Sequence, residues 1–339
     1  MLLERQRRLL ALLDALGGSV SSLDFQKLLF LYTQEEETAP TYDFVPYRFG
    51  GFSFTSYADK RRLIGQGFLA DGERQWSLTE AGHREAGLST ADRVRIDRFA
   101  RRHAGIRGDE LVKYIYRRHP YYAIRSEIVD RVLADDAAAL QAVRDARPVP
   151  LPPGLYTIGY QGRSLEAYLN RLIQAGITLL CDVRRNALSR KYGFSKSTLS
   201  RASDSVGVRY EHLPELGIAS ERRRTLELQA DYDALFADYE RHDLPDQGEA
   251  LERIASWVCL EQQRVALTCF ERRPEQCHRH CVARALEQRF RPVQLKVAHL
   301  MLEQIEYNER KRVSVNRTGV SHGQEHCVSD QDRAGRDGG

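Results

Sequence analysis

The sequence predicts a mixed α/β protein, in which a mostly parallel sheet flanked by helices follows a helical, winged-helix-like domain. Two observations lead to this prediction. In the second half of the chain, apolar runs of strand length alternate with amphipathic helical stretches, as in βαβ units. A proline-rich segment at 148–153 separates them from a first half whose apolar residues recur mainly at helical spacing.

The chain has 339 residues, enough to bury two hydrophobic cores. Hydrophobic residues make up 42% of it and charged residues 29%, which is ordinary for a soluble globular protein. No apolar run approaches the roughly 18 residues of a membrane span, and the first residues lack the apolar core of a secretory signal. The six cysteines show no disulfide framework, so we expect reduced thiols and a cytoplasmic location.

The first two helices are marked by their ends. Leucines at helical spacing give a first helix, which Gly17 and Gly18 stop. Ser21, followed three residues later by Asp24, is a capping signal for the second helix.

A third helix and a hairpin complete the predicted first domain, residues 1–90. The helix is expected over 56–67 and carries three basic residues, Lys60, Arg61 and Arg62. The alternating residues 75–79 predict a strand. Three helices with a small hairpin favour a winged-helix-like domain, which either contacts DNA or has only a packing or dimerisation role. Residues 24–30 and 47–53 also resemble the Panacea-type antitoxin-like domains.

The remaining chain divides by composition. Residues 91–147 are predicted to form a helical connector, and 148–153 a stiff linker. The α/β catalytic domain is expected over 154–305. Residues 308–339 are polar with few apolar side chains, which predicts a disordered tail.

The α/β domain begins with a βαβ unit: a strand over 155–159, a helix that Ser164 caps and Gly176 ends, and a strand over 177–181. Further strands are predicted over 208–213, 265–269 and 293–300, with helical stretches over 220–243, 247–263 and 275–290.

The strand over 177–181 stops at a carboxylate, Asp182, and a cationic loop follows. From Arg184 to Arg201 the loop has no acidic residue and six basic ones: Arg184, Arg185, Arg190, Lys191, Lys196 and Arg201. Ligands of open α/β sheets bind beyond the carboxyl ends of strands, so this loop predicts a polyanion site. The net charge of +4 is weak evidence about nucleic-acid binding, because phosphate binding depends on the local electrostatic field.

A second carboxylate, Glu271, follows the strand over 265–269. If the two strands are neighbours, Asp182 and Glu271 stand at one sheet edge, where one positions water or stabilises positive charge and the other acts as acid or base. His278 and Arg279 are expected at a helix start, where they help to hold phosphate or to orient a carboxylate. A salt bridge of Asp182 to Arg184 is the structural alternative.

The turn after the first strand contains Gly159, Tyr160, Gln161 and Gly162, but not the full dinucleotide-binding pattern. It predicts either a close backbone approach to a ligand, with Tyr160 stacking and Gln161 donating hydrogen bonds, or an ordinary turn with a buried tyrosine. Tyr192 and Phe194 are further aromatics in the cationic loop.

The region 269–281 is dense in possible metal ligands, and Cys277 and Cys281 would share one helical face. Pairs of the Cys-x-x-Cys type are absent, and no cysteine shows the spacing to arginine of a cysteine phosphatase. We therefore predict no metal site and no cofactor.

Four ordered motifs resemble the family called domain of unknown function 488, over about residues 154–300. They are 157–160 (TIGY), 182–195 (DVRRNALSRKYGFS), 210–217 (YEHLPELG), and 269–271 (CFE) followed by 277–279 (CHR). The sequence has Ala187 where the family pattern leads us to expect proline, a change that concerns loop stiffness. The resemblance implies an α/β fold and a cluster of site residues, but no settled reaction.

Together these residues favour a nucleic-acid-directed hydrolase, a DNA glycosylase-like enzyme that removes a base, modified and foreign bases included. The predicted catalytic residues are Asp182, Glu271 and His278. The predicted substrate-binding residues are Tyr160, Gln161, Arg184, Arg185, Asn186, Arg190, Lys191, Tyr192 and Arg279. A role in bacterial anti-phage defence is compatible with the antitoxin-like first domain.

Two alternatives stay open. One is a metal-dependent nuclease or phosphoesterase with Asp182, Glu271 and His278 around a divalent ion. The other is a winged-helix regulator whose α/β domain binds an anionic ligand. Nucleic acid, with DNA favoured, is the expected partner in each of these hypotheses. In the regulator, the α/β domain itself would bind the anionic ligand instead.

Overall fold

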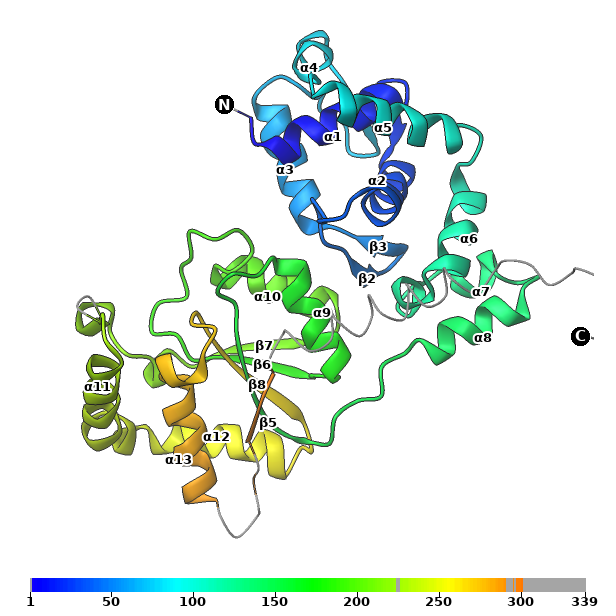
Figure 1. The fold of residues 1–339 in the computed structure, drawn as a ribbon. Helices are drawn as coiled ribbons and strands as arrows, with labels where there is room; N and C mark the ends of the chain where they lie inside the picture. Colours follow the sequence, from blue (N-terminus) through cyan, green and yellow to red (C-terminus); the bar gives the residue numbers. More distant parts are fainter. Residues whose placement is uncertain (1, 224–225, 291–294, 296, 301–339) are drawn as a thin grey trace, which may run out of the picture. The chain divides into compact units, whose positions relative to one another are not determined.

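The computed structural model describes residues 2–223, 226–290, 295 and 297–300 (Figure 1). The chain up to Leu300 forms one compact unit. The predicted tail over 308–339 and the end of the predicted catalytic domain lie outside the described residues. Within the described part of the chain, no helix is both long and apolar enough to cross a membrane.

The first half of the chain is mainly helical, as predicted. Its α-helices are α1 (Glu4–Ala15), α2 (Ser22–Glu36), α3 (Phe54–Gly65), α4 (Glu80–Glu85), α5 (Thr90–Arg102), α6 (Gly108–Arg118), α7 (Val129–Val132) and α8 (Ala137–Asp145). Two short antiparallel pairs accompany them: β1 (Ser19–Ser21) with β4 (Gln75–Ser77), and β2 (Val45–Tyr47) with β3 (Gly50–Phe52).

The predicted helix ends are confirmed. Gly17 and Gly18 follow α1 with φ of 96° and 75°, a conformation that glycine adopts without strain. The Ser21 hydroxyl accepts a hydrogen bond from the Asp24 amide at 3.1 Å and caps α2. The third helix begins two residues earlier than predicted, because the Ser53 hydroxyl caps it by accepting from the Ser56 amide.

The strand predicted over 75–79 is present as β4, but its partner is β1, a strand that was not predicted. Trp76 of β4 is fully buried and packs against Phe25, with ring centroids 4.6 Å apart. Burial of such large aromatics is a main source of stability in this half.

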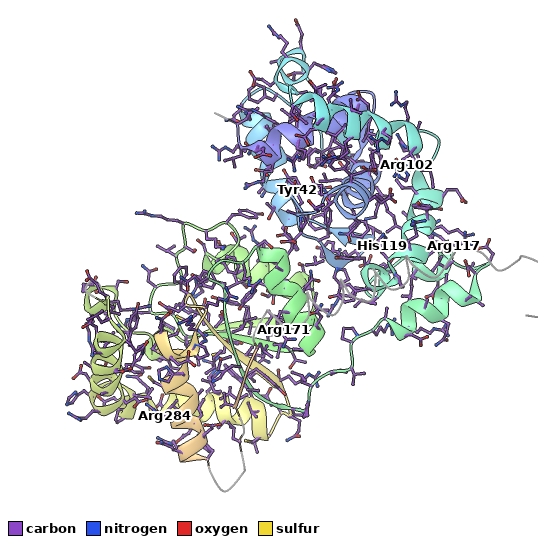
Figure 2. The ribbon with its side chains drawn as sticks, in the orientation of Figure 1. Tyr42, Arg102, Arg117, His119, Arg171 and Arg284 are labelled. Carbon is purple, nitrogen blue, oxygen red and sulfur yellow. The ribbon has the colours of Figure 1, made fainter. Side chains whose placement is uncertain are left out.

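Two residues labelled in Figure 2 show how polar groups are placed in this helical core. Tyr42 donates a hydrogen bond to the Asp59 carboxylate at 2.9 Å. His119 packs edge-on against Phe30, with ring centroids 5.1 Å apart. Burial, together with the nearby charge of Arg118, lowers the pKa of His119 to about 4.

The second half forms a five-stranded, fully parallel sheet. Its strands are β5 (Gly154–Gly159), β6 (Leu179–Asp182), β7 (Arg209–His212), β8 (Arg264–Cys269) and β9 (Val297–His299), in the order β7-β6-β8-β5-β9. The helices of this half are α9 (Leu165–Ala175), α10 (Lys196–Ser205), α11 (Gln229–His242), α12 (Gly248–Cys259) and α13 (Arg279–Arg289). The predicted α/β class is thereby confirmed.

Both faces of the sheet are covered, so its strands are apolar on both sides. Successive strand residues point to opposite faces. Leu179 and Cys181 of β6 therefore join the core formed with α11, α12 and α13, whereas Leu180 joins the core formed with α9 and α10. Ser164 caps α9 and Gly176 ends it with φ of 66°, as predicted.

Two predicted helices are shorter than the sequence suggests. The stretch over 220–243 contains a 3-10 turn, η3 (Ser220–Arg223), and then α11. The helix expected from 275 begins only at Arg279, after the 3-10 turn η5 (Pro274–Gln276). Cys277 between them is extended, with φ of −140°, and breaks the helical run.

Hydrogen bonds join the helical half to α9. Glu166 is fully buried, and its carboxylate accepts from the Thr55 amide at 2.7 Å and from the Ser53 hydroxyl at 3.1 Å. The α9 residue Asn170 donates to the backbone oxygen of Phe44 at 2.7 Å. The start of α3 and the segment before β2 are thus anchored to the helix that follows β5.

Candidate active site

The strand order brings two loops together at the carboxyl edge of the sheet. β6 and β8 are neighbours, with Asp182 opposite Thr268. The adjacency on which the predicted carboxylate pair depends is therefore present. The loop that begins at Arg184 and the loop that carries Glu271 leave the sheet from adjacent strands, at the edge where ligands of open α/β sheets bind.

A pocket of about 280 Å³ lies at these strand ends. Four arginines line it: Arg184, Arg185 and Arg190 from the loop after β6, and Arg223 from η3. The other lining residues are Tyr160, Asn186, Leu188, Ser189, Ile218, Ser220, Cys269, Phe270 and Glu271. Six of the predicted site residues thus share one pocket.

Asp182 does not line this pocket. Its side chain is fully buried, and the guanidinium of Arg184 donates to it through Nε at 2.8 Å and through Nη2 at 2.5 Å. The Tyr210 hydroxyl donates to the same carboxylate at 2.6 Å. Asp182 therefore positions Arg184, and the salt bridge considered from the sequence is formed.

The Arg184 guanidinium also donates hydrogen bonds to groups other than Asp182. Its Nη1 donates to the Tyr160 hydroxyl at 2.7 Å and to the backbone oxygen of Phe194 at 2.8 Å. Burial lowers the pKa of the guanidinium, but the hydrogen bonds and charge of Asp182 more than reverse this, so the pKa is raised. Arg184 is thus a fixed positive charge in the pocket wall.

Tyr160 reaches the pocket but is not available for stacking. Its ring lies on Phe194, with centroids 4.2 Å apart and planes at 7°, and Phe270 meets it edge-on at 5.3 Å. Of these three aromatics, Phe270 is the exposed one, at 41%.

Arg185, Asn186 and Arg190 are exposed and line the pocket. Among the residues that the structure describes, neither Arg185 nor Arg190 makes an ion pair with a carboxylate. The backbone of Arg185 passes close to Gly217, where an added Cβ would lie 2.0 Å from the Arg185 nitrogen. This contact fixes the base of the loop while its side chains remain exposed.

Glu271 is the carboxylate that does line the pocket. Its Oε1 forms an ion pair with Arg223, and its Oε2 lies 3.5 Å from the Cys269 sulfur. Its backbone is held against the end of β5, since a Cβ on Gly159 would lie 1.9 Å from the Glu271 oxygen. The close approach at Gly159 is thus to the protein's own loop.

His278 lies behind Cys269 rather than in the pocket. Its Nε2 donates to the backbone oxygen of Val183 at 2.8 Å, and its Nδ1 is 3.8 Å from the Cys269 sulfur. Within the described chain, Cys269, Cys277 and His278 are a group whose ligand atoms all lie within 4.8 Å of one another. Neither Asp182 nor Glu271 belongs to that group.

The two thiols of this group differ in acidity. Burial raises the pKa of Cys269, but a hydrogen bond from Cys277 and the charges of Arg223 and Arg279 outweigh it, so the pKa falls to about 7. Burial and the same hydrogen bond raise the pKa of Cys277 to about 12. The more acidic thiol is the one that lines the pocket.

Arg279 and Gln161 hold the loop after β8. Arg279 is buried and donates to the backbone oxygens of Glu271 at 2.5 Å and Arg272 at 3.0 Å. The Gln161 side chain accepts from the Arg272 amide at 3.0 Å. Both residues shape the pocket from outside it.

Lys191 and Tyr192 also lie outside the pocket lining. The Tyr192 hydroxyl donates to the backbone oxygen of Phe54 at 3.0 Å, which ties the cationic loop to α3. Lys191 lies over the Phe194 ring at 6.0 Å, and burial lowers its pKa.

Sequence reasoning did not select several lining residues: Leu188, Ser189, Ile218, Ser220, Arg223, Cys269 and Phe270. Cys269 and Phe270 directly follow a predicted buried strand, so the rule that selected Asp182 would have found them. Arg223 does not directly follow a predicted strand, so this rule would not have selected it. Only the folded chain brings η3 to the pocket.

A larger cavity, of about 530 Å³, is lined by residues of α11, α12 and α13 and by Leu244 and Pro245 between α11 and α12. Both of its lining arginines form ion pairs, Arg284 (Figure 2) with Glu240 and Arg289 with Glu252. It contains neither a thiol nor an imidazole. The arginine-lined pocket is therefore the candidate active site.

Residues 164–286 match the family model described as "Domain of unknown function DUF488". The matched segment contains α9 to β8, most of α13 and every pocket residue except Tyr160. Searches of curated proteins and of solved structures returned no match. The resemblance found in the motifs is thus supported for this segment, and it names no reaction.

Proposed function

We propose that this protein is a nucleic-acid-directed hydrolase that removes a base by cleaving its N-glycosidic bond, with DNA as the favoured substrate. The observation that carries the proposal is a pocket lined by four arginines and one carboxylate, that of Glu271. Phosphate groups are the usual partners of clustered arginines, and a glycosidic transition state is cationic at the sugar, where a carboxylate stabilises it.

The structure changes which carboxylate we assign to the reaction. Asp182 is buried behind Arg184, whereas Glu271 lines the pocket. In the proposed reaction the bond between the sugar carbon and the base nitrogen breaks, and its electron pair leaves with the base. Water adds to the sugar carbon and gives a proton to Glu271, and the departing base takes up a proton from solvent.

The arginines divide into two kinds. Arg185 and Arg190 are exposed and form no ion pair among the described residues, so they are free to bind phosphates flanking the target nucleotide. Arg184 and Arg223 each pair with an acid, Asp182 and Glu271 respectively, and orient the groups around the reacting sugar.

Two exposed apolar side chains at the pocket suit an extruded base. Phe270 is 41% exposed and Leu188 is 74% exposed, and both line the pocket. Enzymes that act on a base move it out of the stack, and apolar or aromatic side chains then contact it or fill the gap. Stacking is thereby assigned to Phe270, because Phe194 already covers Tyr160.

The first half of the chain is proposed to be a winged-helix-like domain that helps to bind the substrate. Lys60 does not serve this purpose, since it donates to the backbone oxygens of Gly72 and Gln75 at 2.7 Å. Arg61 and Arg62 beside it are exposed. The role in anti-phage defence depends on the Panacea resemblance alone.

The test is an assay for abasic sites. Duplexes with ordinary and modified bases are incubated with the protein, treated with alkali and analysed for strand breaks. We expect alkali-dependent breaks, reduced by about 10²-fold or more in Glu271→Gln, because general acid–base groups contribute about that much. Glu275→Gln is the matched control, since Glu275 is exposed and outside the pocket lining.

The other outcomes separate the alternatives. Strand breaks without alkali would indicate a nuclease, and sequence-specific binding without covalent change would indicate a regulator. No base release from any duplex, or full activity of folded Glu271→Gln, would refute the proposed reaction.

A further inference from the structure

Three residues between the end of β8 and the start of α13 meet beside the pocket. Cys269 ends β8, Cys277 follows η5 and His278 precedes α13. All three are buried, and their ligand atoms lie within 4.8 Å of one another. Thiolate and imidazole are the ligands that zinc prefers in proteins.

The spacing of the group fits a tetrahedral ion. With zinc–sulfur bonds of about 2.3 Å and zinc–nitrogen bonds of about 2.0 Å, a sulfur and a nitrogen bound to one tetrahedral zinc lie about 3.5 Å apart. The Cys269 sulfur and the His278 Nδ1 are 3.8 Å apart. Only small side-chain movements are needed to place both atoms on one ion.

The imidazole is already oriented for this role. A backbone oxygen can only accept a hydrogen bond, so the contact of Nε2 with the Val183 oxygen at 2.8 Å places the proton on Nε2. The lone pair of the neutral ring is then on Nδ1, which faces Cys269. Histidines that bind metals typically donate their other nitrogen in this way.

The fourth position would face the pocket. Cys269 is the member of the group that lines the pocket. Glu271 lies on the same side, with Oε2 at 3.5 Å from the Cys269 sulfur, but it is not part of the ligand group. Three protein ligands with an open fourth position are typical of catalytic zinc, and a nearby carboxylate can hold the water bound there.

The charges around the group permit a divalent cation. Arg279 directs its guanidinium to the backbone oxygens of Glu271 and Arg272, and Arg223 pairs with Glu271. Two thiolates would balance the two charges of the ion. The bound site would then be close to neutral, beside two arginines that are each bound to the loop after β8.

We propose that Cys269, Cys277 and His278 bind one zinc ion in the wall of the pocket. The ligand set differs from the pair considered from the sequence, because Cys281 lies outside the group. This inference does not depend on the proposed reaction, since a zinc site would be present whatever the substrate.

The experiment measures metal in the full-length protein. After equilibration with zinc and removal of unbound ion by gel filtration, we expect about one zinc per chain by mass spectrometry. X-ray absorption of the zinc form should show two sulfur ligands with nitrogen or oxygen completing the shell. The cobalt form should show the charge-transfer absorption of thiolate ligands.

Variants assign the ligands. Cys277→Ser should lose most of the bound zinc and weaken the cobalt absorption, whereas Cys259→Ser, which alters a thiol of α12 outside the group, should keep both. Zinc-free wild type after equilibration, or a zinc shell without sulfur, would overturn the proposal even if Cys277→Ser failed to fold. A base-releasing protein that binds no zinc would leave the proposed function intact.

Discussion

The pair of Asp182 and Arg184 illustrates how a buried residue can position another that lines the pocket. The carboxylate is fully buried and accepts from Arg184 and from Tyr210. Arg184 in turn presents its charge to the pocket. Loss of the carboxylate charge would leave a buried guanidinium without its partner, which costs far more than loss of an exposed pair.

We therefore expect Asp182→Asn to act mainly on stability. The free energy of unfolding should fall by about 3 kcal/mol, the typical penalty for breaking a buried ion pair. Asp109→Asn, which removes an exposed pair with Arg131, should leave it nearly unchanged. Urea denaturation measures both. An Asp182→Asn protein as stable as wild type would contradict the positioning role.

The sequence identified Asp182 and Arg184 but not their roles. The direction of a carboxylate at a strand end is decided by what surrounds it, here Tyr160 and Phe194, which hold the Arg184 guanidinium. These residues come from separate segments. The local sequence therefore could place the charge at the sheet edge, but could not say whether it faces the pocket.

At the scale of elements, local signals located most of the helices and strands but not their pairing. Ser21, Ser164 and Gly176 mark helix ends through contacts within a few residues, so they could be read from the sequence. The position of β8 between β6 and β5 depends on packing between segments that are distant in sequence. This strand order places Glu271 beside the cationic loop.

The junction of β5 with the loop after β8 can be tested at Gly159. A Cβ there would lie 1.9 Å from the Glu271 oxygen, and the atom in conflict is backbone. We expect Gly159→Ala to lower the free energy of unfolding by at least about 2 kcal/mol, as overpacking does, and to displace Glu271.

The matched control is Gly65→Ala at the end of α3, where an added Cβ meets nothing within 4 Å. It should be neutral or slightly stabilising, because alanine restricts the unfolded chain. Thermal unfolding and the base-release assay compare the two variants. Equal stability of both would mean that the β5 junction is looser than the contact at Gly159 implies.

At the scale of the whole molecule, the net charge of +4 does not reveal the positive pocket. Acidic residues elsewhere offset most of the positive charge, but between Arg184 and Arg201 there are none. The local field is what attracts a polyanion, and it is strengthened where side chains such as Arg185 and Arg190 lack acidic partners among the described residues. The central claim is that these arginines bind nucleic acid phosphates.

That claim is tested most directly by the salt dependence of DNA binding. Each phosphate contact contributes about 0.9 to the slope of log affinity against log salt for duplex DNA. The double variant Arg185→Gln/Arg190→Gln should bind a labelled duplex more weakly, with a slope smaller by about 1.8. Arg144→Gln, exposed on α8 and outside the pocket lining, should keep the wild-type slope. An unchanged slope in the double variant, or no binding of the duplex by wild type, would contradict the account.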